Sequence, residues 1–234
     1  MSRSRAGPSR LIHGRRHGKK LRPGRRALIE RLLPELRVVV PQRGALDPRA
    51  LFDPPVSEVW LEVGFGAGEH LAAQARVHPD IGMIGCEPFV NGVASLLATV
   101  AAEDLRNVRV LDDDARPLLE ALPEAAIGRL FVLFPDPWPK RRHHKRRFVN
   151  RANLDTCARI LRDGGELRIA TDHDEHFRWI LDHLRRHGAF EWLSRRPGDW
   201  RARPDDWPAT RYEAKARAQG RQPVYLRYRR VPRG

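Results

Sequence analysis

The chain has 234 residues, of which 41% are hydrophobic, and its 44 basic residues exceed the 29 acidic ones to give a net charge of +15. This length suffices for one large domain with a full core. No apolar run approaches the roughly 18 residues needed to cross a bilayer, which excludes a membrane-spanning protein, and the arginine-rich N-terminus lacks the apolar stretch of a secretory signal.

The cysteines give a further constraint. Cys86 and Cys157 lie far apart, with no Cys or His at ligand spacing. They indicate neither a disulfide framework nor a zinc site, so we expect no metal and a reducing, cytoplasmic location. Nothing in the sequence implies an obligatory protein partner.

The positive charge is concentrated in three segments. Residues 1–26 hold ten basic and no acidic residues, residues 140–147 hold six and none, and residues 195–234 hold twelve against four. These segments carry +24 together, so the remainder of the chain carries −9. Such segregation favours a polyanionic partner, because neutralising phosphates releases counterions. A merely solvated tail is the alternative, particularly for the N-terminal segment.

In chain order, residues 1–26 form a basic arm that we expect to be disordered, and a single domain is expected over residues 27–234. Apolar spacing predicts a helix over Ala27–Leu36, and strands alternate with helices from Glu58 onward. The predicted strands are Glu58–Val63, Ile81–Glu87, Val108–Leu111, Arg129–Phe134 and Glu166–Thr171, with a late strand in Pro223–Val231. The predicted helices between them are Glu69–Val77, Phe89–Glu103, Pro117–Leu122, and segments near Arg147–Leu161 and Glu175–His187. This alternation predicts an α/β fold with a mostly parallel sheet, helices on both faces, and ligands at the carboxyl ends of the strands.

A glycine turn follows the first strand. The segment EVGFGAGEH places glycines at positions 64, 66 and 68. A nicotinamide-binding pattern, G-x-G-x-x-G, requires its third glycine at position 69, which is glutamate here, so the spacing disfavours a dehydrogenase. A tight turn with no ligand role is the simpler alternative.

Acidic residues stand near the ends of three successive strands. Glu87 closes the second strand about 20 residues beyond the turn, where an acid in this architecture binds the hydroxyls of a ribose. Glu62 precedes the turn, where it can face a cationic amino-acid moiety, and one of Asp112–Asp114 can accept from an adenine amine. The sequence leaves open which of the three does so, and a solvated loop is the alternative. Together these acids suggest S-adenosylmethionine as the ligand.

The most specific stretch is LFVLFPDPWPKRRHHKRR, Leu130–Arg147. Three prolines in five residues fix the backbone and hold Asp136 and Trp138 at the carboxyl end of the fourth strand. The basic cluster that follows, Lys140–Arg147, is expected to extend from this loop toward the phosphate backbone of a nucleic acid. Trp138 either stacks on an unpaired base or packs as core, and a stiffened turn without function is the alternative for the loop.

With these motifs the chain resembles the bacterial tRNA (guanine-N7)-methyltransferase family. The resemblance rests on GFGAG, FPDPWPKRRHHKRR, the Thr-Asp pair at 171–172 and PATRYE at 208–213, and it extends from the arm to the last strand. It implies a Rossmann-like class I methyltransferase fold, S-adenosylmethionine as methyl donor, and a guanine at tRNA position 46, in the variable loop, as acceptor.

The resemblance also implies roles for individual residues. The implied cofactor-binding residues are Glu62, Gly64, Gly66, Gly68, Glu87, Asp114 and Asp136, with Asp136 also the catalytic residue. The implied substrate-binding residues are Lys140, Asp172, Thr210, Arg211, Tyr212 and Glu213. The implied RNA contacts are Arg142, His143, His144, Lys145, Arg146 and Arg147. The family's T-K-F-E reads Thr-Arg-Tyr-Glu here, and the Arg-Gly that usually follows is replaced by Lys215 and Ala216.

The implied chemistry depends on positioning, because guanine N7 carries a lone pair and no proton. Two other functions are weighed against it. An N6-adenine methyltransferase carries an Asp-Pro-Pro-aromatic loop, but Trp138 takes the place of the second proline here. A non-catalytic RNA-binding module on the same fold would not need the intact glycine turn and acids.

Overall fold

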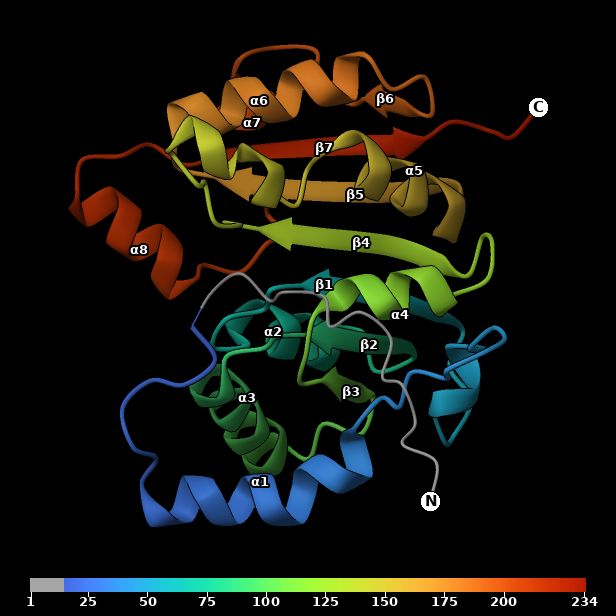
Figure 1. The fold of residues 1–234 in the computed structure, drawn as a ribbon, viewed down its shortest axis with the longest axis vertical. Helices are drawn as coiled ribbons and strands as arrows, with labels where there is room; N and C mark the ends of the chain where they lie inside the picture. The colour runs from blue at the N-terminus through green and yellow to red at the C-terminus, as the bar shows by residue number, and fades with distance from the viewer. Residues whose placement is uncertain (1–14) are drawn as a thin grey trace, which may run out of the picture.

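The computed structural model describes residues 15–234 and contains a seven-stranded sheet in the order β3-β2-β1-β4-β5-β7-β6 (Figure 1). The strands are β1 (Glu58–Val63), β2 (Ile81–Cys86), β3 (Val108–Leu111), β4 (Ile127–Leu133), β5 (Leu161–Thr171), β6 (Phe190–Trp192) and β7 (Val224–Arg230). Neighbours among β1 to β5 pair in parallel, whereas β7 runs antiparallel to β5 and β6. The predicted α/β fold with a mostly parallel sheet is confirmed.

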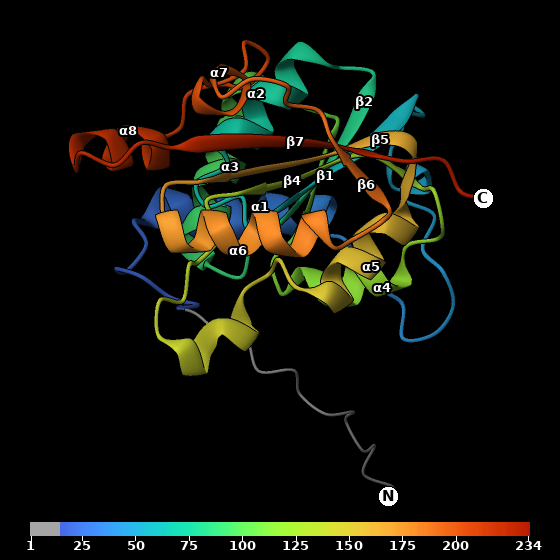
Figure 2. The ribbon, with the colours of Figure 1, turned by 90° about the horizontal axis from the view of Figure 1, so that it is seen from above.

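Helices cover both faces of this sheet. They are α1 (Pro23–Leu36), α2 (Glu69–Val77), α3 (Val90–Glu103), α4 (Ala115–Ala121), α5 (Arg151–Ile160), α6 (Asp174–Arg185), α7 (Gly198–Arg201) and α8 (Arg211–Ala218), with 3-10 turns η1 (Arg49–Leu51) and η2 (Arg141–Arg146). Figure 2 shows α2 on one side of the sheet and α4, α5 and α6 on the other. Two hydrophobic clusters follow this division, one containing Leu71 and Leu97 and the other Leu118 and Ile180. No helix within residues 15–234 is both long and apolar enough to span a membrane.

The predicted bounds of β1, β3 and α2 match the structure. β5 begins at Leu161, five residues before the predicted strand, because pairing with β4 extends it through an Asp-Gly-Gly segment that resembles a turn. Besides the two 3-10 turns, the structure adds one strand, β6, and two α-helices, α7 and α8, that the sequence did not predict. These lie in a polar and basic part of the chain where hydrophobic periodicity is weak.

The described part of the basic arm, residues 15–26, contacts α3, whereas residues 1–14 lie outside the described part of the chain, so the expected disorder of the arm stays a prediction. The backbone N–H of Gly18 donates to Asn91 Oδ1 at 2.8 Å, and Asn91 Nδ2 donates to the carbonyl of Lys19 at 2.8 Å. This segment therefore lies along the start of α3. Pro23 then opens α1 four residues before the predicted helix, because its fixed φ suits a first helical turn, so α1 crosses the predicted boundary at residue 26.

Candidate active site

A cavity of about 440 Å³ opens at the carboxyl ends of the central strands. The glycine turn, the end of β2 and the proline loop after β4 form its wall, and Glu87 and Asp136 both line it. Cavities of this size are typical of small-molecule sites, and this edge of a parallel sheet is where such sites occur. Two acids predicted separately from strand ends thus share one cavity.

The glycine turn depends on backbone conformations that other residues rarely adopt. Gly66 and Gly68 have φ values of 58° and 81°. A Cβ on Gly68 would lie 2.7 Å from the Leu96 side chain, so glycine is also needed for α3 to pack against the turn. Gly92 of α3, which sequence reasoning missed, has the same role, because a Cβ there would lie 2.1 Å from the carbonyl oxygen of Gly66. The sequence signal that could have indicated this role is a single glycine inside the otherwise apolar helix α3.

Glu87 is fixed by two backbone donors. Its carboxylate accepts from the N–H of Gly66 at 2.8 Å and from the N–H of Phe89 at 2.9 Å, and the residue is 9% exposed. Burial raises the pKa of Glu87, the two N–H groups act against this rise, and the negative charge of Asp136 adds to it. The cavity therefore presents a rigid carboxylate with lone pairs left for a ligand.

The proline loop carries backbone strain. Phe134 and Trp138 have positive φ values of 50° and 42°, a conformation that is unusual for aromatic residues and is concentrated at functional sites. The N–H of Phe134 donates to the carbonyl of Ala170 at 2.8 Å, which attaches the loop to the end of β5. Asp136 is exposed as a residue, but desolvation of its carboxyl group at the cavity raises its pKa above the usual value.

Glu62 and Asp114 already have partners in the structure. Glu62 is buried below the turn and binds His70 Nδ1 at 2.7 Å, beside a small adjoining cavity. Asp114 caps α4 by accepting from the N–H of Arg116 at 2.9 Å, and it also pairs with the guanidinium of that residue. It borders a neighbouring cavity of about 140 Å³. Their assignment as cofactor ligands stays a prediction.

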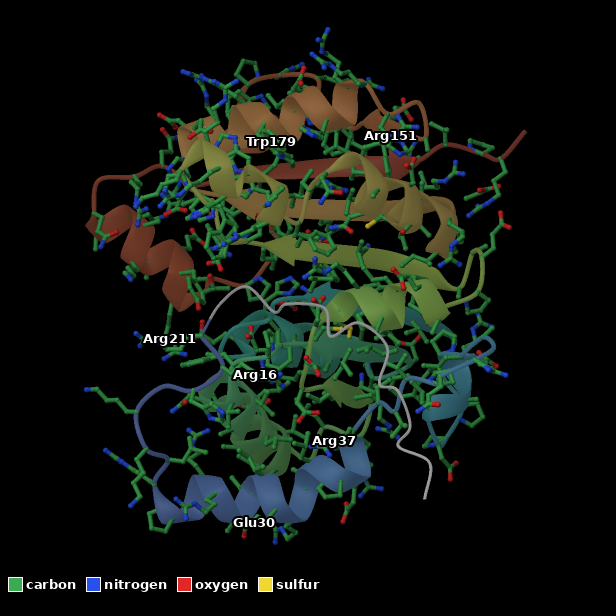
Figure 3. The ribbon with its side chains drawn as sticks, viewed as in Figure 1. Arg16, Glu30, Arg37, Arg151, Trp179 and Arg211 are labelled. Atoms are coloured by element: carbon green, nitrogen blue, oxygen red, sulfur yellow. The ribbon has the colours of Figure 1, made fainter. Side chains whose placement is uncertain are left out.

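The TRYE segment forms the start of α8. Thr210 accepts from the N–H of Glu213 at 3.2 Å and caps the helix. Arg211 pairs with Glu69 of α2 and extends from α8 on the side that faces α2 (Figure 3). Tyr212 lines the main cavity and stacks near Phe134, with ring centroids 6.4 Å apart. Burial, with the charges of Glu87 and Asp136, raises the pKa of Tyr212.

The two acids predicted to bind substrate are paired with arginines. Glu213 is buried and binds Arg203 and Arg217 at 3.2 and 3.0 Å, and Asp172 binds Arg221 at 3.2 Å. Neither lines the main cavity. A substrate role for them stays a prediction that requires these pairs to open.

The basic cluster divides into exposed and packed residues. Lys140, Arg142 and Lys145 are exposed, as an RNA-contact role requires. Arg146 lies over the ring of Trp138 with its guanidinium carbon 4.9 Å from the centroid, and both side chains line the cavity. His143 meets the same ring edge-on at 5.8 Å, and His144 binds Glu175 at 3.2 Å. Trp138 is therefore part of the cavity wall and not of the core.

The structure contradicts the prediction that Arg147 contacts RNA. The residue is only 1% exposed, and its guanidinium donates to the carbonyls of Pro137 and Trp138 and to the carboxylate of Glu175. A buried guanidinium that is committed to these acceptors cannot reach a phosphate. Its local sequence, a run of cations, gave no sign that one of them points inward.

A second cavity, of about 430 Å³, adjoins the first. Lys20, Arg22, Arg25 and Arg211 line it, no acidic residue among residues 15–234 does so, and it shares Tyr212 with the main cavity. Sequence reasoning missed this site because the arm and α8 are almost 200 residues apart. The excess of cations at both ends of the chain was the only sign of it.

Solved structures with the same architecture identify the fold. The structure of the 16S rRNA methyltransferase KamB aligns with a TM-score of 0.55 and 20% identity, covering 84% of this chain and 99% of that one. A SAM-dependent O-methyltransferase from Thermotoga maritima aligns with a TM-score of 0.50 and 17% identity, covering 80% and 64%. The fold is that of the class I S-adenosylmethionine-dependent methyltransferases.

Sequence comparison narrows this class to one family. A family model described as "Putative methyltransferase" matches residues 57–226. The tRNA (guanine-N(7)-)-methyltransferase of Rhodospirillum rubrum is 51% identical over 95% of this chain and 88% of its own length, and that of Paramagnetospirillum magneticum is 54% identical over 94% and 92%. The chain belongs to the tRNA (guanine-N(7)-)-methyltransferase family, which confirms the resemblance found in the sequence.

Proposed function

We propose that this protein transfers the methyl group of S-adenosylmethionine to N7 of a guanine in tRNA, at position 46 of the variable loop, in the cytoplasm. The observation that carries the proposal is the shared cavity of Glu87 and Asp136, bordered by a strained proline loop and flanked by cations. Membership of the family supports the choice of tRNA and of guanine.

The residues present fit the cofactor. Glu87 offers fixed acceptors for the ribose hydroxyls, and a Cβ on Gly64 would meet no protein atom within 4 Å, so the turn borders open space. Asp114 would accept from the adenine amine in the neighbouring cavity. When bound, S-adenosylmethionine supplies a methyl group made electrophilic by its sulfonium.

Asp136 has two tasks in this proposal. Guanine N7 needs no base to become a nucleophile, so the carboxylate orients the purine and offsets the positive charge that the ring gains on methylation. Asp136 is exposed as a residue, but the cavity wall desolvates its carboxyl group, which weakens solvent screening of its charge. The rigid loop holds the carboxylate where that charge develops.

Incubation with labelled S-adenosylmethionine and unmodified tRNA tests the function directly. We expect one labelled guanine per tRNA, at position 46, and cleavage of the RNA at N7-methylguanine maps it. Label on adenine would support an adenine methyltransferase instead. Binding of the cofactor by calorimetry without any transfer would support a non-catalytic RNA-binding module.

The second cavity gives a separate prediction about tRNA binding. We expect Lys20→Ala to weaken tRNA binding and to reduce the slope of log affinity against log salt by about one, because one phosphate contact is lost. Filter binding at several salt concentrations measures this slope. Arg185→Ala is the control, since that exposed side chain lies on α6 and lines neither cavity. If the salt dependence of tRNA affinity had the same slope in both variants, tRNA would not bind at the second cavity.

A further inference from the structure

The buried guanidinium of Arg147 holds the segment directly after Asp136. Its Nε donates to the carbonyl of Pro137 at 2.7 Å, and its Nη2 lies 3.4 Å from the carbonyl of Trp138. The planar fork of an arginine suits two adjacent acceptors, which the point charge of a lysine cannot match. One side chain thereby binds two consecutive peptide units of the loop.

Arg147 is itself held by α6. Its Nη2 binds Glu175 Oε1 at 2.8 Å, and its guanidinium carbon lies 4.8 Å from the ring centroid of Trp179, which Figure 3 labels on α6. The indole N–H of Trp179 donates to the carbonyl of Val149 at 2.6 Å, which fixes the ring. The hydrogen bond from Arg147 also lowers the pKa of Glu175, so this carboxylate is ionised at neutral pH.

The proline loop needs such a support. Its three prolines carry no N–H, so the loop has few donors of its own with which to satisfy its carbonyls. Phe134 and Trp138 are moreover held in a strained conformation, which persists only where the surroundings enforce it. Arg147 supplies donors from outside the loop at the point of strain.

We propose that Arg147 is a positioning residue for methyl transfer: with Glu175 and Trp179 behind it, it fixes the loop that places Asp136 at the cavity. The proposal rests on the proposed function. It assigns to one cation of the basic cluster a role in the geometry of the reaction, in contrast to the RNA-binding role of its exposed neighbours.

Arg147→Lys tests the proposal, because it keeps the charge and removes the fork. We expect kcat to fall about 10-fold to 100-fold, as for a small misplacement of a catalytic group, while KM for tRNA and for S-adenosylmethionine changes less than about twofold. Glu175→Ala should lower kcat in the same way, and Glu175→Gln should restore part of it by keeping an acceptor. Arg151→Lys is the matched control, since Arg151 lies exposed at the start of α5 (Figure 3). Its partner there is Asp155.

Hydrogen exchange provides a readout that does not depend on activity. In Arg147→Lys and in Glu175→Ala the amides of Asp136, Trp138 and Lys140 should exchange faster than in the wild type, with the exchange of β4 unchanged. A wild-type kcat and wild-type exchange in either folded variant would overturn the proposal. A rise in KM for tRNA with unchanged kcat would also overturn it, since that is the signature of an RNA contact. If the wild type itself failed to methylate tRNA, the proposed function would fail, whereas the exchange result would still decide whether Arg147 holds the loop.

Discussion

Asp136→Ala is expected to lower kcat about 100-fold to 1000-fold while changing the affinity for tRNA less than about twofold. Asp136 lines the cavity from a rigid loop. In the proposed function its carboxylate acts on the charge that appears during transfer and contributes little to holding the RNA. Single-turnover rates with saturating tRNA and cofactor measure the first quantity, and filter binding of tRNA measures the second.

Asp136→Asn separates charge from shape. The amide keeps the volume and one acceptor but loses the negative charge, so we expect most of the loss in kcat to remain. Since burial raises the pKa of Asp136, the wild-type rate should fall as pH falls through this raised value, at a higher pH than an ordinary aspartate would show. This fall in rate at low pH should be absent from the pH–rate profile of the Asn variant. Equal losses in rate and in tRNA affinity would contradict the assignment.

The fold followed from the sequence because its strands are short apolar runs closed by turns or acids. β1, for example, is the run EVWLEV between a proline-containing loop and the glycine turn, and its bounds match the prediction. α8 has no apolar face to mark it, and only its cap, Thr210 with Glu213 three residues later, has a local signal. Its Arg211 pairs with Glu69 of α2 and its Tyr212 lines the main cavity, and a single sequence does not display such contacts between distant segments.

The site was predictable to the extent that parallel strands bring their carboxyl ends to one edge. This rule placed Glu87 and Asp136 together although 49 residues separate them. It does not say which of several adjacent cations points inward. Arg147 differs from Arg146 only through acceptors that the folded loop creates and through Glu175, which lies 28 residues further along the chain.

Glu87→Ala is expected to weaken the binding of S-adenosylmethionine about 100-fold or more, with tRNA affinity almost unchanged. Hydrogen bonds to a charged group contribute about 1.5–3 kcal/mol each, and two ribose hydroxyls would lose their acceptor. The N–H groups of Gly66 and Phe89 would also lose theirs, so the glycine turn should become less ordered before any ligand binds. Titration calorimetry with the cofactor measures the affinity, and thermal unfolding without it measures the cost to the turn.

Glu87→Gln distinguishes these two effects. The amide oxygen can still accept from the turn, so thermal stability should stay near that of the wild type, while cofactor affinity falls about tenfold because the charge is gone. The raised pKa of Glu87 gives a second check: cofactor affinity of the wild type should decline as pH falls through that value, since the protonated acid is the weaker acceptor. Glu103→Gln is the control, because Glu103 is exposed at the end of α3, pairs with Arg76 and lines neither cavity. A wild-type affinity in Glu87→Ala would show that the cavity of Glu87 and Asp136 is not where the ribose binds, and the assignment of this cavity to the methyl donor would then be wrong.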